Sequence, residues 1–270
     1  MRRAGLWTGV VLVALVLLAA LVSLVWTPYN PLQVQPSQTL RPAGWPHLLG
    51  TDGFGIDILS RLLVGARTTV YVGVVAVSLA ALGGVPLGIL AGMLGGWVSQ
   101  VVLRVTDVLY AFPALLLAIL LAAAVGASTT TAMVAIGIAS IPAFARVARA
   151  ATLIVMTQDY ILAATASGTS RWTTSVRHVL PNIAAVLGVQ ASVSFGIAIL
   201  AEAALSYLGL ATPPPTPTWG RMLHDAQTYI FSAPVQALWP GLAIALSVLG
   251  LNLLGDGLRD HLDPRLREAA

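Results

Sequence analysis

The residues best suited to engage a partner gather in one segment, residues 160–182, which reads YILAATASGTSRWTTSVRHVLPN. Two adjacent small residues, Ala163 and Ala164, permit the close approach of another surface. Gly168, four residues after Ala164, tolerates the left-handed backbone that turns one short helix into another. Pro181 is typical of the first turn of a helix. These residue types favour a docking loop, and the alternative is an ordinary connecting loop.

The same segment carries two basic residues, Arg171 and Arg177, ahead of Leu180 and Pro181. A guanidinium group pairs strongly with carboxylates, so both arginines are candidate ion-pair donors to an acidic rim on a partner. Orientation of the chain in a membrane is an equal alternative for these charges. Leu180 and Pro181 would transmit movement of the docking loop to the helix that follows.

The rest of the chain offers few residues suited to catalysis or metal binding. There is no cysteine, so the chain has no disulfide and no thiolate nucleophile. The four histidines fall in separate segments, at positions 47, 178, 224 and 261, so a shared metal site is not expected. Asp52 and Asp57 lack the alternating oxygen ligands of a calcium loop, and we expect them in a turn or a helix cap. We therefore predict no catalytic residue and no metal ligand.

Composition places the chain in a membrane. Hydrophobic residues make up 57% of the 270 residues and charged residues only 9%, and the mean hydropathy is +0.87. A soluble domain carries about 25% charged residues. All 14 basic residues are arginine, so the chain lacks the lysine of a Walker A nucleotide-binding loop. We interpret the basic charge as membrane orientation rather than nucleic-acid binding.

Six stretches approach the roughly 20 apolar residues that cross a bilayer. They are residues 6–26, 69–93, 108–125, 130–145, 183–208 and 238–254. The first continues too far for a signal peptide, and we expect it to remain as an anchor. Pro86 and Pro113 lie inside two of the stretches and predict kinks.

Arginine placement predicts the orientation of these spans, because arginine is enriched on the cytoplasmic side. With the N-terminus inside, ten arginines are cytoplasmic and four are not. The ten are Arg2, Arg3, Arg104, Arg146, Arg149, Arg171, Arg177, Arg259, Arg265 and Arg267, and the four are Arg41, Arg61, Arg67 and Arg221. Both termini and the docking loop are therefore expected in the cytoplasm, and residues 27–67 outside.

Small residues recur every fourth position in two of the predicted spans. Such a ridge allows helix backbones to approach closely in lipid. The second span carries Ala76, Ala80, Gly84, Gly88, Gly92 and Gly96, and the fifth carries Ala184, Gly188, Ser192 and Gly196. We predict tight helix packing at both ridges.

From about residue 47 onward, the chain resembles the permeases of the dipeptide, oligopeptide and nickel class of ABC importers, in particular their C-type subunit. The spacing in residues 160–182 also resembles the EAA loop by which such permeases engage their ATPases. The matching stretches are 49–52 (LGTD), 60–63 (SRLL), 65–67 (GAR), 95–97 (GGW), 111–113 (AFP), 205–210 (LSYLGL), 217–220 (PTWG), 252–260 (NLLGDGLRD) and 262–267 (LDPRLR).

Three positions depart from that pattern. Leu162 stands where the EAA consensus has glutamate, and Thr165 stands where this class often has arginine. Both departures remove a charged side chain that the resemblance would place in the docking loop. Ile56 stands where the class usually has arginine, in the stretch from Gly55 to Asp57.

The resemblance implies an all-α, polytopic protein of about six transmembrane helices with the type I ABC importer permease fold. Residues 1–68 would form an anchor helix and an extracytoplasmic segment. Residues 69–270 would form the core permease domain, with the coupling loop at about 159–182. The implied location is the bacterial inner membrane.

The implied partners are a homologous B-type permease, two ATP-binding subunits or one fused ATPase, and an extracytoplasmic peptide-binding protein. ATP and magnesium would bind in the partner subunits and no cofactor in this chain. Import of di- or oligopeptides is the expected function. Nickel or opine import remains open, as does a stand-alone secondary transporter.

Ser192 and Glu202, both in the fifth predicted span, are candidates for the wall or gate of the pathway. An ionisable side chain at membrane depth is costly unless it faces a partner or a water-filled cavity. Glu202 is expected either to form a structural hydrogen bond near the outer gate or to contact substrate amino groups.

Overall fold

The computed structural model describes residues 2–262, and within this range the chain is all-α. The predicted motif at residues 262–267 therefore lies almost wholly outside the described residues. The helices are α1 (Arg2–Val25), η1 (Pro36–Gln38), α2 (Ile58–Leu94), α3 (Gly96–Ala111), α4 (Ala114–Val125), α5 (Thr129–Met156), α6 (Asp159–Ala166), α7 (Arg171–Thr174), η2 (Ser175–Val179), α8 (Leu180–Tyr207), α9 (Trp219–Gln227) and α10 (Val235–Leu262). The η1 segment is a 3₁₀-helix and η2 is a π-helix.

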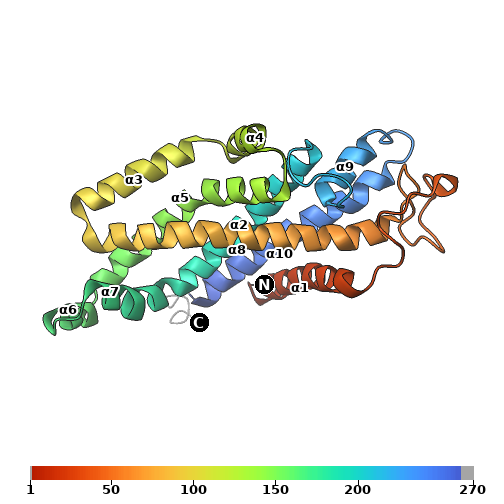
Figure 1. Ribbon diagram of the computed structural model, residues 1–270. Coiled ribbons are helices and arrows are strands. Elements are labelled where there is room, and N and C mark those ends of the chain that lie inside the picture. The colour runs from red at the N-terminus through yellow and green to blue at the C-terminus, as the bar shows by residue number, and fades with distance from the viewer. Residues whose placement is uncertain (1, 263–270) are drawn as a thin grey trace.

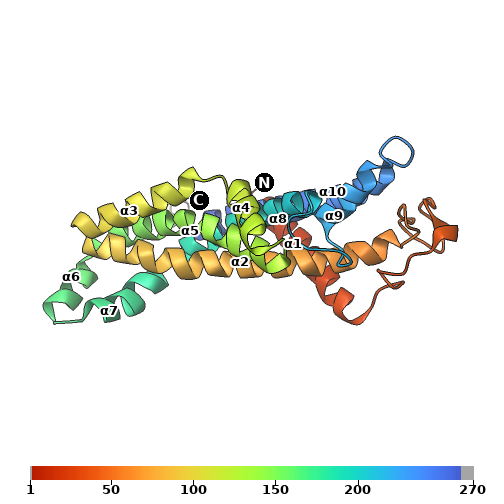
Figure 2. The same ribbon diagram turned by 45° about the horizontal axis from the view of Figure 1, so that its top comes forward.

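The long helices form one elongated bundle with two distinct ends (Figure 1). α2 packs most extensively against α5, while α1 packs against α10 and α2. α8 lies between α10, α5 and α2. We call the end formed by α6 and α7 the α6 end. The opposite end, formed by residues 26–57, α9 and the α9–α10 connection, is the α9 end (Figure 2).

Five helices are long and apolar enough to cross a membrane, and the pair α3 and α4 together makes a bent sixth. This agrees with the expectation of about six transmembrane helices. The helices extend beyond several predicted limits: α2 begins at Ile58 rather than residue 69, and α5 continues to Met156 rather than residue 145. The expected division at residue 68 thus falls inside α2. α2 also continues through Pro86.

The third predicted span, residues 108–125, is bent at Pro113, as the sequence predicted, and the bend divides it between α3 and α4. α3 and α4 are bent by 78° at the break between them. Phe112 has an extended backbone, with φ −85° and ψ 119°. The ring of a proline disfavours helical backbone in the residue before it, so Pro113 ends α3 at this point. With 12 residues, α4 is only about 18 Å long and cannot cross a bilayer core of about 30 Å alone.

Short polar side chains fix where several helices begin. Asp57 is the N-cap of α2, and its Oδ2 accepts a hydrogen bond from the backbone N of Ser60 at 2.8 Å. Asp52 holds a turn, because its Oδ1 accepts from the backbone N of Phe54 and Ile56. The expected turn and cap roles of these two aspartates are thereby confirmed. Ser128 caps α5 in the same manner.

The small-residue ridge of α2 lies directly against α5. A Cβ atom at Gly84 would lie 2.6 Å from the Cβ of Phe144, and one at Gly88 would lie 2.6 Å from the Cβ of Ala148. At Gly92 it would lie 2.7 Å from the Cβ of Thr152. These distances are too short for any side chain, so glycine sets the separation of the two helices.

Gly96 does not share this contact. It is the first residue of α3 and directly follows Gly95, which links α2 to α3. Both glycines have positive φ, +60° for Gly95 and +49° for Gly96. No atom of the described residues lies within 4 Å of where its Cβ would stand. The predicted ridge therefore ends at Gly92.

A second glycine contact joins α1 to α10. A Cβ at Gly9 would lie 2.6 Å from the backbone N of Leu254 and 2.9 Å from the carbonyl oxygen of Gly250. A Cβ at Gly250 would lie 2.7 Å from the Cβ of Leu12. The two backbones therefore cross at Gly9 and Gly250, and this contact holds α1 against the rest of the bundle.

Candidate functional site

The α6 end carries the predicted docking loop as a helical hairpin that projects from the bundle (Figure 2). α6 ends at Ala166, and Gly168, two residues later, has a φ of +81°, the left-handed backbone that the sequence predicted for this glycine. The backbone N of Gly168 donates to the carbonyl oxygen of Thr165, and the backbone N of Thr169 donates to that of Ala164, both at 3.0 Å. This pair of hydrogen bonds is the Schellman motif, which requires a left-handed residue after the helix.

Ser170 starts the next helix of the hairpin. Its hydroxyl oxygen accepts a hydrogen bond from the backbone N of Thr173 at 3.2 Å and so caps α7. The chain therefore reverses within residues 167–170. Glycine supplies the left-handed turn and serine supplies the cap.

One side chain fastens the hairpin to the bundle. Ile161 of α6 is 1% exposed and lies in an apolar cluster with Val155 of α5 and with Val179 and Ile183 near the start of α8. The ring of Tyr160 also lies beside that of His178, with centroids 6.2 Å apart and the ring planes tilted by 53°. α6 is thus anchored at its first turn to α5 and to the start of α8.

Pro181 lies in the first turn of α8, as predicted. The turn before it is the π-helix η2, in which the backbone N of Leu180 donates to the carbonyl oxygen of Ser175. A proline has no N–H and displaces the carbonyl group four residues earlier, so a wider turn ahead of Pro181 relieves that clash. α7, η2 and α8 thereby form one long apolar span over residues 171–207.

The outward surface of the hairpin is more apolar than the sequence analysis expected. Leu162 is 61% exposed and Trp172 is 77% exposed. A hollow of about 370 Å³ lies among Trp172, Thr173, Val176 and Arg177. Sequence reasoning missed Trp172, although a tryptophan in an otherwise polar loop was an available signal.

The small pair and the arginines are placed unequally in this surface. Ala163, Arg171 and Arg177 are exposed, whereas Ala164 is half-buried. No ion pair within the described residues involves either arginine. The exposed part of the hairpin therefore combines apolar side chains with two arginines, a composition typical of a protein interface.

The two pathway candidates lie inside the packing of this chain rather than on its surface. Glu202 is 1% exposed, and its Oε1 accepts a hydrogen bond from the hydroxyl of Ser206 at 2.6 Å. Its Oε2 has no partner among the described residues. Ser192 donates to the carbonyl oxygen of Leu251 in α10. For Glu202, this geometry favours the structural alternative over contact with substrate.

The predicted small-residue ridge of the fifth span divides into two halves. Ser192 and Gly196 face α10, and a Cβ at Gly196 would lie 3.8 Å from Val248. Ala184 is exposed, and nothing in the described part of the chain lies within 4 Å of a Cβ at Gly188. Among the described residues, only the half nearer the α9 end packs against another helix.

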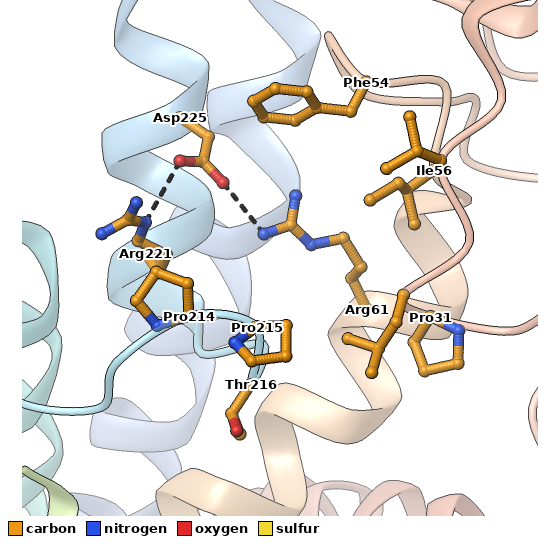
Figure 3. A pocket seen from close by; sticks show the side chains of 11 residues that line it. Pro31, Phe54, Ile56, Arg61, Pro214, Pro215, Thr216, Arg221 and Asp225 are labelled. Atoms are coloured by element: carbon orange, nitrogen blue, oxygen red, sulfur yellow. Dashed lines mark hydrogen bonds and ion pairs between the residues drawn. The ribbon is translucent and has the colours of Figure 1, made fainter.

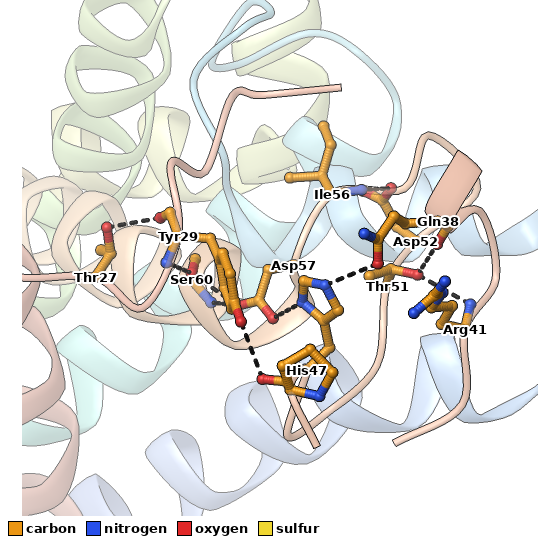
Figure 4. Close-up of polar contacts among 11 residues, drawn as sticks. Thr27, Tyr29, Gln38, Arg41, His47, Thr51, Asp52, Ile56, Asp57 and Ser60 are labelled. Atoms are coloured by element: carbon orange, nitrogen blue, oxygen red, sulfur yellow. Dashed lines mark hydrogen bonds and ion pairs between the residues drawn. The ribbon is translucent and has the colours of Figure 1, made fainter. Parts of the chain in front are cut away.

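The α9 end holds a buried polar network (Figure 4). The Nδ1 of His47 lies 2.9 Å from the Oδ1 of Asp57, and its Nε2 lies 3.2 Å from the Oε1 of Gln38. The hydroxyl of Ser60 donates to the other oxygen of Asp57 and accepts from the backbone N of Tyr29. These bonds fix residues 26–57 onto the first turn of α2.

A second set of contacts ties this end to α9 and α10. Arg61 of α2 pairs with Asp52 and, at 2.9 Å, with Asp225 of α9 (Figure 3). The Nε2 of Gln236 donates to the carbonyl oxygen of Thr51 at 3.3 Å. Buried polar contacts thus join residues 26–57 to α2, α9 and α10. No local sequence pattern predicted these contacts.

Comparison with known proteins gives consistent matches. Residues 84–268 match the family described as "Binding-protein-dependent transport system inner membrane component". The dipeptide transport system permease protein DppC of Alkalihalophilus pseudofirmus is 40% identical over 96% of this chain and 85% of its own length. The glutathione transport system permease protein GsiD of Pectobacterium atrosepticum is 45% identical over 82% of this chain and 73% of its own.

A third relative, the di/tripeptide transport system permease protein DppC of Pseudomonas aeruginosa, is 41% identical over 98% of this chain and 90% of its own length. The agreement spans the long helices, the hairpin and the α9 end. Together with the apolar spans, these matches identify a multi-pass membrane protein. The chain belongs to the family of binding-protein-dependent transport system inner membrane components.

Proposed function

We propose that this chain is one permease subunit of an ATP-driven importer and forms half of a transmembrane pathway for di- and oligopeptides. The observation that carries this proposal is the α6–α7 hairpin. It is an exposed, partly apolar surface whose two arginines have no ion-pair partner among the described residues, and it is fastened through Ile161 to the helices that would line the pathway. A second, homologous permease would supply the other half.

ATP hydrolysis in the partner subunits would move the hairpin. ATP and magnesium would bind in two ATP-binding subunits or one fused ATPase, because this chain has no lysine for a phosphate-binding loop. Closure of those subunits would move α6, and Ile161 and Pro181 would pass the movement to α5 and α8. The pathway would then alternate between its two openings.

Cargo identity follows from the relatives, whose names specify dipeptides, di/tripeptides and glutathione. All three are short peptides, whereas nickel and opines share no such backbone. We expect proteoliposomes containing the assembled importer and its binding protein to accumulate a labelled dipeptide in the presence of ATP. Uptake of labelled nickel or of an opine, with none of dipeptide or glutathione, would reject the peptide assignment.

The orientation proposed from the arginines places the α6 end and both termini in the cytoplasm and residues 27–67 outside. Reporter fusions after Ser37 and after Ala270 are expected to report opposite sides of the membrane. Alkaline phosphatase and a fluorescent protein give complementary readouts for this test. If both fusion points report the same side, the six-span orientation is wrong.

A further inference from the structure

We propose that one face of α10 lines the peptide pathway and that Asn252 on this face contacts the backbone of the passing peptide. The face is a stripe of exposed residues spaced three or four positions apart, so they share one side of the helix. Its members are Leu242, Ala245, Leu249, Asn252, Asp256 and Arg259. The inference rests on the proposed function, because it requires a pathway that carries peptides.

The stripe changes from apolar to polar along the helix. Toward the α9 end it is apolar, with Leu242 41% exposed and Leu249 47% exposed. From Asn252 onward it carries an amide, a carboxylate and a guanidinium group. Within the described part of the chain, the side chains of Asn252, Asp256 and Arg259 have no hydrogen-bond or ion-pair partner. A face covered by lipid tails would be apolar throughout, so the polar half faces something else.

Contacts with α1 place Asn252 at membrane depth. The apolar run of α1 that is long enough to cross a membrane begins at Ala4. A Cβ at Gly9, five residues into this run, would lie 2.6 Å from the backbone N of Leu254. Asn252 is two residues nearer the α9 end than Leu254, so it lies at least as deep as Gly9. An amide without a partner is costly in hydrocarbon, and Asn252 must therefore face water or another polar group.

α8 leaves room beside the polar half of the stripe. The two helices still touch at Ser192, whose Cβ lies 3.4 Å from where a Cβ of Gly255 would stand. One turn nearer the α6 end, no atom of the described residues lies within 4 Å of a Cβ at Gly188, and Ala184 is exposed. α8 thus presents two small, uncovered residues on the side that faces α10 one turn earlier. Small side chains leave space for a passing molecule next to the polar residues of α10.

The polar half suits a water-filled pathway better than a dry contact with the second permease. In a dry contact, Asp256 and Arg259 would each need a charged partner, because an unpaired buried charge is strongly destabilising. Water satisfies both groups without such partners, and the two charges match the amino and carboxylate ends of a short peptide. Contact with the second permease is the alternative that the test below separates.

The amide of Asn252 fits the backbone of a peptide. A carboxamide offers two hydrogen-bond donors and an acceptor, and a peptide group offers one of each. Hydrogen bonds to the backbone do not depend on the side chains of the cargo, as passage of different short peptides requires. Asn252 therefore stands where the apolar part of the α10 stripe gives way to the part that lines the pathway toward the α6 end.

The test measures the accessibility of an introduced cysteine, since the chain has no cysteine of its own. The complete importer carrying Asn252→Cys is placed in nanodiscs and treated with a charged, membrane-impermeant maleimide. Alternating access opens this half of the pathway in only one state. Labelling of the chain is therefore expected to be several-fold faster in one of two states, nucleotide-free or trapped with ATP and vanadate. In proteoliposomes, the attached reagent should also abolish ATP-dependent uptake of a labelled dipeptide, because it fills the pathway.

Val11→Cys is the matched control for this experiment. Val11 is 54% exposed on α1, two residues after Gly9, and so lies at a similar depth on a face that lipid would cover. We expect no labelling of this variant in either state and no loss of uptake after treatment. Asp256→Cys repeats the test one turn along the stripe, in case Asn252→Cys does not assemble. Size-exclusion chromatography checks that each complex is intact.

Failure of the inference can be distinguished from failure of the proposed function. If Asn252→Cys and Asp256→Cys stay unlabelled in both states while uptake continues, the stripe is a contact with the second permease and the proposed function stands. Equal labelling in both states, or labelling that leaves uptake intact, would place the stripe in water outside the pathway. A wild-type importer that accumulates no dipeptide with its binding protein and ATP would reject the proposed function, and this inference with it.

Discussion

Replacing Gly88 with leucine is expected to prevent recovery of the intact importer. A Cβ at this position would lie 2.6 Å from the Cβ of Ala148 and 2.9 Å from the backbone N of Arg149. Backbone cannot move aside as a flexible side chain can, so α2 and α5 must separate. Overpacking of a tight contact costs about 1–3 kcal/mol, and this is the most extensive helix pair of the fold. Yield after detergent extraction and the thermal unfolding midpoint measure the effect.

Gly241→Leu provides the matched control for this substitution. Gly241 is also helical, in α10, and no atom of the described residues lies within 4 Å of its Cβ position. We expect this variant to assemble with nearly wild-type yield. Equal yields for the two variants would show that the α2–α5 contact tolerates a side chain, and the importance assigned to the ridge would be wrong.

The ridge of α2 could be predicted because its spacing of four residues persists through the helix. The same spacing included Gly96, which the structure places at the start of α3 with positive φ. Sequence spacing alone cannot separate a glycine chosen for close packing from one chosen for positive φ. The neighbouring Gly95 was the available signal, since two consecutive glycines are typical of a turn.

The break between α3 and α4 shows a second limit of span prediction. Hydropathy is continuous across residues 108–125, so a length criterion joins them. The effect of Pro113 on its neighbour Phe112 is local and could be expected. The angle of 78° depends on packing against other helices, which no local rule provides.

The contacts of the two α1 glycines with α10, and the polar contacts at the α9 end, could not be predicted from residue spacing. Gly5 and Gly9 do form a small-x-x-x-small pair, which was a usable signal for α1. Its partner on α10 could not be named. Likewise, Asp225 lies 164 residues after Arg61, and only the fold brings them together.

The coupling loop was the part most fully predictable, because its features are local. A left-handed glycine, a serine cap and a proline in the first turn of the next helix each act within a few residues. Its exposed apolar surface was not predicted, since exposure of Leu162 and Trp172 depends on how α6 sits on α5 and α8. In the proposed interface, that apolar surface would take the place of the consensus glutamate that this loop lacks.

Replacing Gly168 with valine is expected to abolish binding-protein-stimulated ATP hydrolysis while the membrane spans remain folded. Gly168 has φ +81° in the Schellman motif that ends α6. A β-branched residue is strongly disfavoured in left-handed backbone, at a cost of at least ~1–2 kcal/mol. The hairpin would adopt another turn and displace Ala163 and Trp172 from the interface. Purification of the complex, followed by ATPase assay with and without loaded binding protein, measures the loss.

Gly168→Asn separates the effect of backbone conformation from that of added size. Asparagine enters left-handed backbone far more readily than valine, and no atom of the described residues lies within 4 Å of the Cβ position. We therefore expect stimulation of ATP hydrolysis to be largely retained in this variant.

A charge placed on the exposed surface by Ala163→Glu should abolish stimulation without changing the turn. If Gly168→Val and Ala163→Glu both keep wild-type stimulation, the hairpin does not transmit ATP hydrolysis, because neither its shape nor its surface would then matter to the partner.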